Sequence, residues 1–248
     1  MSFTKRIFID LNCDLGEGAD HDAELMPLIT SANIACGAHA GDEGTMRATV
    51  ALAREHGVAV GAHPGFADRA NFGRTEQPLT ACALHDLITW QVDALRDLGP
   101  VRYVKPHGAL YNLAARDRAV AEVIAEAVYE CDPKLMLFGL AGSELVAAGR
   151  ARGLVVASEV FADRTYQADG ALTPRTRADA LIVDEEAAVA QVLRMVREGV
   201  VRATDGTDVP IVADTVCLHG DGANAVAFAR RLNTELRAAG ISIRAFGS

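Results

Sequence analysis

The sequence contains few lysines and no tract of basic residues. Only Lys5, Lys105 and Lys134 are lysines among its 248 residues, and the formal net charge is −9. Nucleic acids and anionic membranes bind clustered Lys and Arg side chains, so this charge pattern argues against both as partners.

The sequence also lacks paired cysteines and long apolar segments. Its five cysteines are scattered, and no two are spaced as Cys-X-X-Cys. Such a set argues against a disulfide framework or a zinc ribbon and favours a reducing compartment. Residues 1–10 contain no apolar core of a secretory signal, and no apolar run approaches the length of a membrane span. We therefore expect a soluble, cytoplasmic protein.

Several motifs that mark common active sites are missing as well. No lysine follows a glycine, which excludes a Walker A phosphate loop, and the short GEG of residues 16–18 is no dinucleotide fingerprint. There is no GxSxG around a serine and no HxxxH or HExxH pair of histidines. If the reaction uses ATP, we expect another chain to bind the nucleotide.

Short apolar runs alternate with amphipathic stretches along the chain. The apolar runs predict seven strands: Ile7–Asn12, Ala32–Cys36, Val58–His63, Val101–His107, Leu135–Gly139, Leu154–Phe161 and Asp214–His219. The amphipathic stretches predict helices: Glu43–His56, Thr80–Leu98, Arg116–Cys131, Ser143–Arg152, Asp184–Glu198 and Ala223–Ala239.

Repeated strand–helix alternation is typical of a parallel sheet covered by helices. Seven such strands in a chain of this length predict one α/β domain, residues 1–248, folded as a seven-stranded TIM-like (β/α) barrel. An open doubly wound sheet is the alternative. The irregular segments Pro64–Pro78 and Ala162–Ala180 are long for loops of a compact domain, so they are candidate lids or docking surfaces.

The first predicted strand carries polar residues on one face. In FIDLNCDLGEGAD, residues 8–20, alternation places Asp10, Asn12 and Asp14 on one side and apolar residues on the other. Burying three polar side chains is costly unless they are paired. The segment is therefore either a solvated edge strand or the acidic wall of an active site.

Polar side chains also follow most of the other predicted strands. Because the carboxyl ends of parallel strands meet at one edge, closure of the barrel would gather these residues at one mouth. Taken singly, His63 has an ordinary interpretation as a buried core histidine and His39 as a helix cap. The residues at strand ends are Asp14, Glu17, His39, His63, Lys105, His107, Glu159, Arg164, His219 and Asp221.

Lys105 lies inside a predicted strand and should be partly buried. A buried ammonium needs an acidic partner or a lowered pKa. Lys105 is therefore either a structural ion pair, with Asp10 or Asp14, or a group that stabilises an oxyanion or phosphate or acts as a general acid.

Metal binding and cysteine chemistry are the remaining alternatives at these strand ends. Asp14, His39 and His63 would be the natural ligands for zinc or a similar ion, but we rank direct acid–base use higher and assign no metal. Cys13 and Cys36 fall on faces opposite the polar residues and are better explained as core cysteines.

Taken together, several segments resemble the LamB/YcsF family. They occur in the family's order: IDLNCDLGEG, SANIACGAHAGD, VGAHPGF, FGR, YVKPHGALYN, EVFADRTYQADGAL and HGD. The resemblance implies a (β/α) barrel of the glycoside hydrolase and deacetylase type. It also implies an ATP-dependent hydrolase in which this chain would be the A subunit of a 5-oxoprolinase, working with subunits B and C. The implied reaction converts 5-oxo-L-proline, ATP and water to L-glutamate, ADP and phosphate.

We assign roles to the strand-end residues on this expectation. Asp14 or Glu17 would orient or deprotonate water, His39, His63 and His107 would move protons, and Lys105 would stabilise an oxyanion or phosphate. Two rivals are a metal-dependent deacetylase or amidase and a non-catalytic substrate-binding subunit. The expected substrate-binding residues are Asp10, Asn12, Arg74, Glu159, Arg164, His219 and Asp221.

Overall fold

Seven parallel strands form a closed barrel in the computed structural model, which describes residues 8–218 and 224–248. Each strand pairs with the next, and pairing of β1 with β9 closes the ring. The barrel prediction is therefore confirmed, and the open sheet is excluded. The barrel strands are β1 (Phe8–Leu15), β2 (Ser31–Ala35), β3 (Ala59–His63), β4 (Tyr103–Val104), β5 (Met136–Leu140), β6 (Val155–Phe161) and β9 (Thr215–Leu218).

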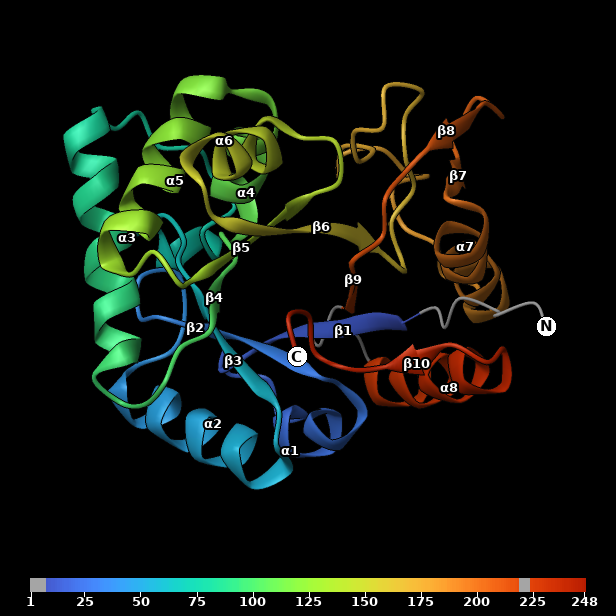
Figure 1. Cartoon of the computed structure of the whole chain (residues 1–248), viewed down its shortest axis with the longest axis horizontal. Helices are drawn as coiled ribbons and strands as arrows, with labels where there is room; N and C mark the ends of the chain where they lie inside the picture. The colour runs from blue at the N-terminus through green and yellow to red at the C-terminus, as the bar shows by residue number, and fades with distance from the viewer. Residues whose placement is uncertain (1–7, 219–223) are drawn as a thin grey trace.

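Helices surround the barrel (Figure 1). Most begin at a side chain that accepts a backbone N–H, as Asp42 does from Thr45 at 2.8 Å ahead of α2. No helix within the described residues is long and apolar enough to cross a membrane. The helices are α1 (Asp22–Leu25), α2 (Glu43–His56), α3 (Ala81–Arg96), α4 (Gly108–Arg116), α5 (Arg118–Cys131), α6 (Glu144–Arg152), α7 (Glu185–Glu198) and α8 (Ala225–Ala238), with the 3-10 turns η1 (Met26–Leu28) and η2 (Arg69–Asn71).

Three features differ from the sequence-based expectation. The helix expected over Arg116–Cys131 is preceded by a separate helix, α4, and Asp117 caps α5 at the break. Strand β10 (Ser242–Ile243) pairs with the start of β1, and β7 (Val200–Arg202) pairs with β8 (Asp208–Pro210) as an antiparallel hairpin. Strand pairs of two or three residues leave too short a hydrophobic pattern to detect.

The fourth strand is also shorter than expected. Only Tyr103 and Val104 pair as β4, because Pro106 has no N–H to continue the ladder. The backbone nevertheless stays beside β3, since the N–H of Lys105 bonds to the carbonyl of Ala62 at 2.9 Å and that of His107 to Pro64 at 2.8 Å. These bonds hold the side chains of Lys105 and His107 at the barrel mouth.

The two faces of β1 separate as predicted, and both are buried. Ile9, Leu11 and Cys13 belong to the main hydrophobic cluster with the outer helices. Asp10 and Asn12 on the other face are fully buried and form hydrogen bonds with Thr215 on the neighbouring strand β9. The solvated-edge interpretation is therefore wrong, because strands pair with β1 on both sides.

Gly61 on β3 leaves room for the largest side chain inside the barrel. A Cβ at this position would lie 2.1 Å from the ring of Tyr103, whose hydroxyl donates to Asn33 at 2.7 Å and whose ring stacks on Phe138. We expect Gly61→Ala to lower the free energy of unfolding by about 3 kcal/mol in urea titrations, because the buried ring must move. Gly44→Ala on exposed α2 is the matched control, and equal stability of the two variants would contradict this packing argument.

Candidate active site

A cavity of about 900 Å³ opens at the carboxyl ends of the barrel strands. Parts of both long irregular segments, 64–78 and 162–180, contribute to its wall. The cavity therefore lies where the closed barrel was expected to gather its polar residues. The expected site residues that line it are Asp14, Glu17, His63, Arg74, Lys105, His107 and Arg164.

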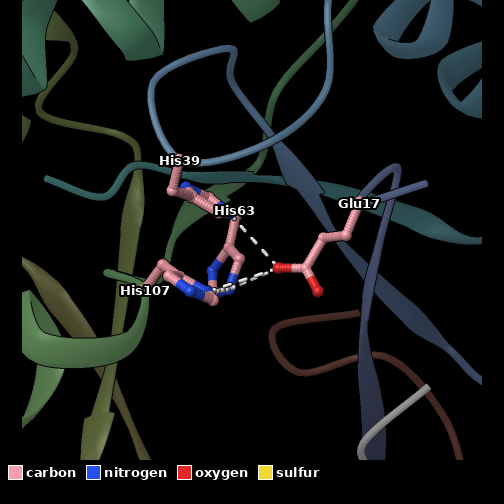
Figure 2. Close-up of side chains that lie close together, drawn as sticks. All are labelled: Glu17, His39, His63 and His107. Atoms are coloured by element: carbon pink, nitrogen blue, oxygen red, sulfur yellow. Dashed lines mark hydrogen bonds and ion pairs between the residues drawn. The ribbon is translucent and has the colours of Figure 1, made fainter. Parts of the chain in front are cut away.

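Glu17 and three imidazoles form a compact cluster beside this cavity (Figure 2). The Oε1 atom of Glu17 lies 3.2 Å from Nε2 of His39, 3.3 Å from Nδ1 of His107 and 3.9 Å from Nε2 of His63. The residues come from four segments: the turns after β1 and β2, the end of β3 and the residue before α4. The side-by-side order of β1, β2, β3 and β4 thus brings together groups that are up to 90 residues apart in sequence.

Two glycines make room for the imidazole rings. A Cβ at Gly65 would lie 2.7 Å from Nδ1 of His39, and one at Gly73 would lie 2.8 Å from Cβ of His39. Gly73 also has a positive φ of 63°, which glycine adopts readily. Gly65 belongs to the VGAHPGF segment and Gly73 to the FGR segment. Because a Cβ at either position would collide with His39, both segments need glycine there.

Backbone carbonyls orient two of the three imidazoles. Nδ1 of His63 lies 2.7 Å from the carbonyl oxygen of Lys105, and Nε2 of His107 lies 2.9 Å from that of Phe72. A carbonyl oxygen only accepts hydrogen bonds, so each of these nitrogens carries a proton. The remaining nitrogens, Nε2 of His63 and Nδ1 of His107, face each other at 2.9 Å beside Glu17.

The protonation states in the cluster follow from burial and these contacts. Burial alone would raise the pKa of Glu17, but the hydrogen bonds with His107 and His39 outweigh it and lower the pKa to about 2. Burial lowers the pKa of His39 to about 4, so this imidazole is neutral at pH 7. For His63 burial acts to lower the pKa, but the neighbouring Asp14 outweighs it and raises the pKa. Glu17 is thus a weak base, and its negative charge suits it to bind a cationic group.

Lys105 is buried at the base of the cavity in a network of acceptors. Its Nζ lies 2.9 Å from Asp14, 3.0 Å from Glu159, 3.1 Å from Asn12 and 3.1 Å from Sγ of Cys217. Burial favours the neutral amine, but Asp14, Cys217 and Glu159 together outweigh it and raise the pKa of Lys105 well above its usual value. The expected ion pair of Lys105 therefore forms with Asp14 and not with Asp10. A substrate oxyanion that bound to Lys105 would have to share one of its ammonium N–H groups with these acceptors.

Only some of the other residues expected to bind substrate line the cavity. Asn12 and Glu159 are fully buried and bond to each other at 2.8 Å beneath Lys105. Neither lines the cavity. Arg164 does line it, and it donates to the carbonyls of Thr173 at 2.6 Å and Ala180 at 3.3 Å, while burial lowers its pKa to about 10. His219 and Asp221 lie outside the described residues.

Asp10 occupies a separate hydrophilic cage inside the barrel. Its carboxylate accepts hydrogen bonds from Thr30 and Ser31, both at 2.7 Å, and from Thr215. It does not line the cavity, and burial raises its pKa. Asp10 therefore belongs to a hydrogen-bonded group inside the barrel, and it does not reach the cavity where a substrate contact was expected.

Tyr111 on α4 is a cavity residue that the sequence interpretation missed. Its ring is buried, and burial together with Glu159 raises the pKa of its hydroxyl well above the usual value. Among the described residues neither this hydroxyl nor Oε2 of Glu159 has a hydrogen-bond partner of normal geometry. The YVKPHGALYN segment contains Tyr111, but a tyrosine in an apolar helical pattern is usually a core residue.

The imidazole cluster is also a group that could hold a metal ion. The donor atoms of Glu17, His39, His63 and His107 all lie within 4.8 Å of one another. The metal set considered from sequence had Asp14 in place of Glu17 and omitted His107. Asp14 lies just outside the cluster, with Oδ2 at 3.4 Å from Nε2 of His63.

Known proteins resemble the chain over nearly its whole length. A model of the LamB/YcsF family matches residues 9–248. The chain is 56% identical to the 5-oxoprolinase A subunit from Bacillus licheniformis over 250 residues, which cover 97% of this chain and 99% of that one. The crystal structure of the lactam utilization protein from Thermus thermophilus is 44% identical, with a TM-score of 0.91 over 97% of this chain and 100% of that one. A T48 deacetylase with substrate shares the fold alone, at 13% identity and a TM-score of 0.52 over 96% of this chain and 87% of that one. The chain belongs to the LamB/YcsF family.

Proposed function

We propose that this chain is the A subunit of an ATP-dependent 5-oxoprolinase and opens the lactam ring of 5-oxo-L-proline to give L-glutamate. The main support is the 56% identity to a protein named as the A subunit of 5-oxoprolinase. The buried ionisable groups around a cavity at the barrel mouth are consistent with such a reaction.

The chemistry explains why ATP is consumed. A lactam amide is a poor electrophile, and transfer of phosphate from ATP to its oxygen would make the ring carbon more electrophilic. Water would then add to that carbon, and the C–N bond would break as the ring nitrogen takes up a proton. The resulting acyl phosphate would be hydrolysed to L-glutamate and phosphate. The sequence contains no phosphate loop. We therefore assign nucleotide activation to the partner subunits B and C and ring opening to this chain. Arg74 and Arg164 line the cavity and provide positive charge for the substrate carboxylate or the phosphate.

The proposed proton transfers use groups that reach the cavity. Glu17, with its pKa of about 2, is a weak base, so we assign the orientation and deprotonation of water to Asp14, which also lines the cavity. Tyr111 keeps its proton at neutral pH and can donate it to the ring nitrogen. His63 and His107 also line the cavity, where they can pass protons or hold an ion.

Reconstitution tests this function directly. Purified subunits B and C should release glutamate from 5-oxo-L-proline and ATP only when this chain is added. His107→Ala should abolish the release, whereas His56→Ala on the exposed end of α2 should not. Full activity of B and C alone would contradict the proposal. Activity that survives Asp14→Asn, Lys105→Met and His107→Ala in turn would instead make this chain a substrate-presenting subunit.

Asp10 allows stability to be separated from substrate binding. We expect Asp10→Ala to lower the free energy of unfolding by about 3 kcal/mol, because three hydroxyls, two of them buried, lose their shared acceptor. The KM for 5-oxo-L-proline should stay unchanged, since Asp10 does not line the cavity. Asp97→Ala on the surface is the control for denaturant titration. A KM raised tenfold at normal stability would show that Asp10 binds substrate after all.

A further inference from the structure

Two imidazole nitrogens in the cluster face each other at hydrogen-bond distance. Nε2 of His63 and Nδ1 of His107 are 2.9 Å apart, and the opposite nitrogen of each ring donates to a backbone carbonyl. In neutral imidazoles both facing nitrogens therefore present lone pairs. The carboxylate of Glu17, at 3.3 Å from His107 and 3.9 Å from His63, adds negative charge at the same point. This arrangement calls for a positive charge between the three groups.

The spacing of the three donor atoms matches the coordination shell of a small divalent cation. Ligands at the usual zinc distances in a tetrahedral site are about 3.3 Å apart. The three separations here are 2.9, 3.3 and 3.9 Å. Metal-binding histidines usually donate their other N–H to a carboxylate or a backbone carbonyl, and both of these histidines do so.

Ring orientation decides which histidines can share one ion. A metal lies close to the plane of each imidazole that binds it. The rings of His39 and His107 are stacked, with centroids 3.8 Å apart and planes inclined by 2°, so one ion cannot lie in both planes. The rings of His63 and His107 are inclined by 87° and their planes can meet at one ion.

The cavity wall agrees with this choice of ligands. Glu17, His63 and His107 line the cavity, whereas His39 does not. His39 instead contacts Glu17 from behind through its Nε2 atom, at 3.2 Å. A fourth coordination position would thus open toward the substrate, as in catalytic rather than structural metal sites.

From this geometry we propose that Glu17, His63 and His107 form a binding site for one divalent transition-metal ion, with His39 as a positioning residue for Glu17. Two imidazoles and one carboxylate suit zinc first, and also Mn²⁺ or Fe²⁺. A bound ion would supply a Lewis acid next to Asp14 and Lys105. In this arrangement His63 and His107 hold an ion instead of carrying protons. The metal site does not depend on which lactam the cavity accepts.

Calorimetric titration of chelator-treated protein with Zn²⁺, in the absence of substrate, tests the site. The wild-type chain should bind one ion with micromolar or tighter affinity. His107→Ala and His63→Ala should each weaken binding at least 100-fold. His39→Ala should weaken it about 10- to 100-fold, as expected for a group that holds a ligand in place. His56→Ala, on an exposed helix end, is the control and should bind normally.

Cobalt adds a spectroscopic measurement that reports on the ligands themselves. Co²⁺ in a four-coordinate site absorbs strongly in the visible range, and this absorption should disappear in His107→Ala but not in His56→Ala. If wild-type protein binds neither ion, or if His107→Ala binds both as well as the wild type does, the proposal is wrong and a proton shared by His63 and His107 remains. Metal binding is measured without substrate, so its result does not depend on whether the chain is part of a 5-oxoprolinase.

Discussion

Lys105→Met is expected to lower ring-opening activity by about 100- to 1,000-fold and the free energy of unfolding by about 3–5 kcal/mol. The ammonium of Lys105 lies between Asp14 at 2.9 Å and Glu159 at 3.0 Å, and Glu159 is fully buried. Methionine fills a similar volume but leaves both carboxylates without their counter-ion. Activity is measured as glutamate release by the reconstituted complex, and stability by urea titration.

A second substitution separates the two effects of Lys105. In Lys105→Met with Glu159→Gln, the uncompensated buried charge is removed, so most of the stability should return. Activity should not return, because the positive charge at the cavity is still missing. Lys134→Met at an exposed position is the matched control. If the double variant regains both stability and activity, Lys105 is only a structural ion pair.

Glu17→Gln is expected to reduce turnover by about 100- to 1,000-fold while the protein remains folded. The amide keeps the shape of the side chain but loses the charge that the three imidazoles surround. Because the pKa of Glu17 is lowered to about 2, the wild-type group is ionised throughout the range in which the enzyme is assayed. The loss of activity should therefore be the same at every pH between about 5 and 9.

The stability of this variant should show a defined pH dependence. A carboxylate with a lowered pKa stabilises the folded state above its unfolded pKa of 4.5, and this contribution is lost as the pH falls from 4.5 toward 2. The difference in unfolding free energy between wild type and Glu17→Gln should shrink over that window. Glu24→Gln on the surface serves as the control. Turnover of Glu17→Gln within about fivefold of the wild type would remove Glu17 from the active site.

The sequence indicated which face of β1 is polar but not how deep each side chain lies. Asp10, Asn12 and Asp14 share a face, yet a strand advances about 3.3 Å per residue. Asp14 therefore reaches the cavity, Asn12 lies beneath Lys105, and Asp10 sits in its own cage of hydroxyls. Alternation predicts a face, whereas depth depends on the stagger of neighbouring strands, which one sequence does not reveal.

The convergence of histidines at the barrel mouth was predictable, but their mutual geometry was not. Strand–helix alternation was sufficient to place His39, His63 and His107 at one end. The stacking of His39 on His107 depends on Gly65 and Gly73, whose role becomes visible only when the segments pack. Glu17 likewise lies in a turn outside any periodic element, so its central position among the imidazoles had no signal in the pattern.

Closure of the barrel through β1 and β9 also affects how the chain is made. The ribosome releases β1 first, but Thr215, which pairs with Asp10, follows 205 residues later. At usual elongation rates this delay is roughly 10 to 40 s. During that time β2 can cover one edge of β1, while the edge that will meet β9 has no partner and Asp10 lacks one of its three hydroxyls. Nascent chains on one polysome are therefore exposed to strand pairing with each other until residue 218 has emerged.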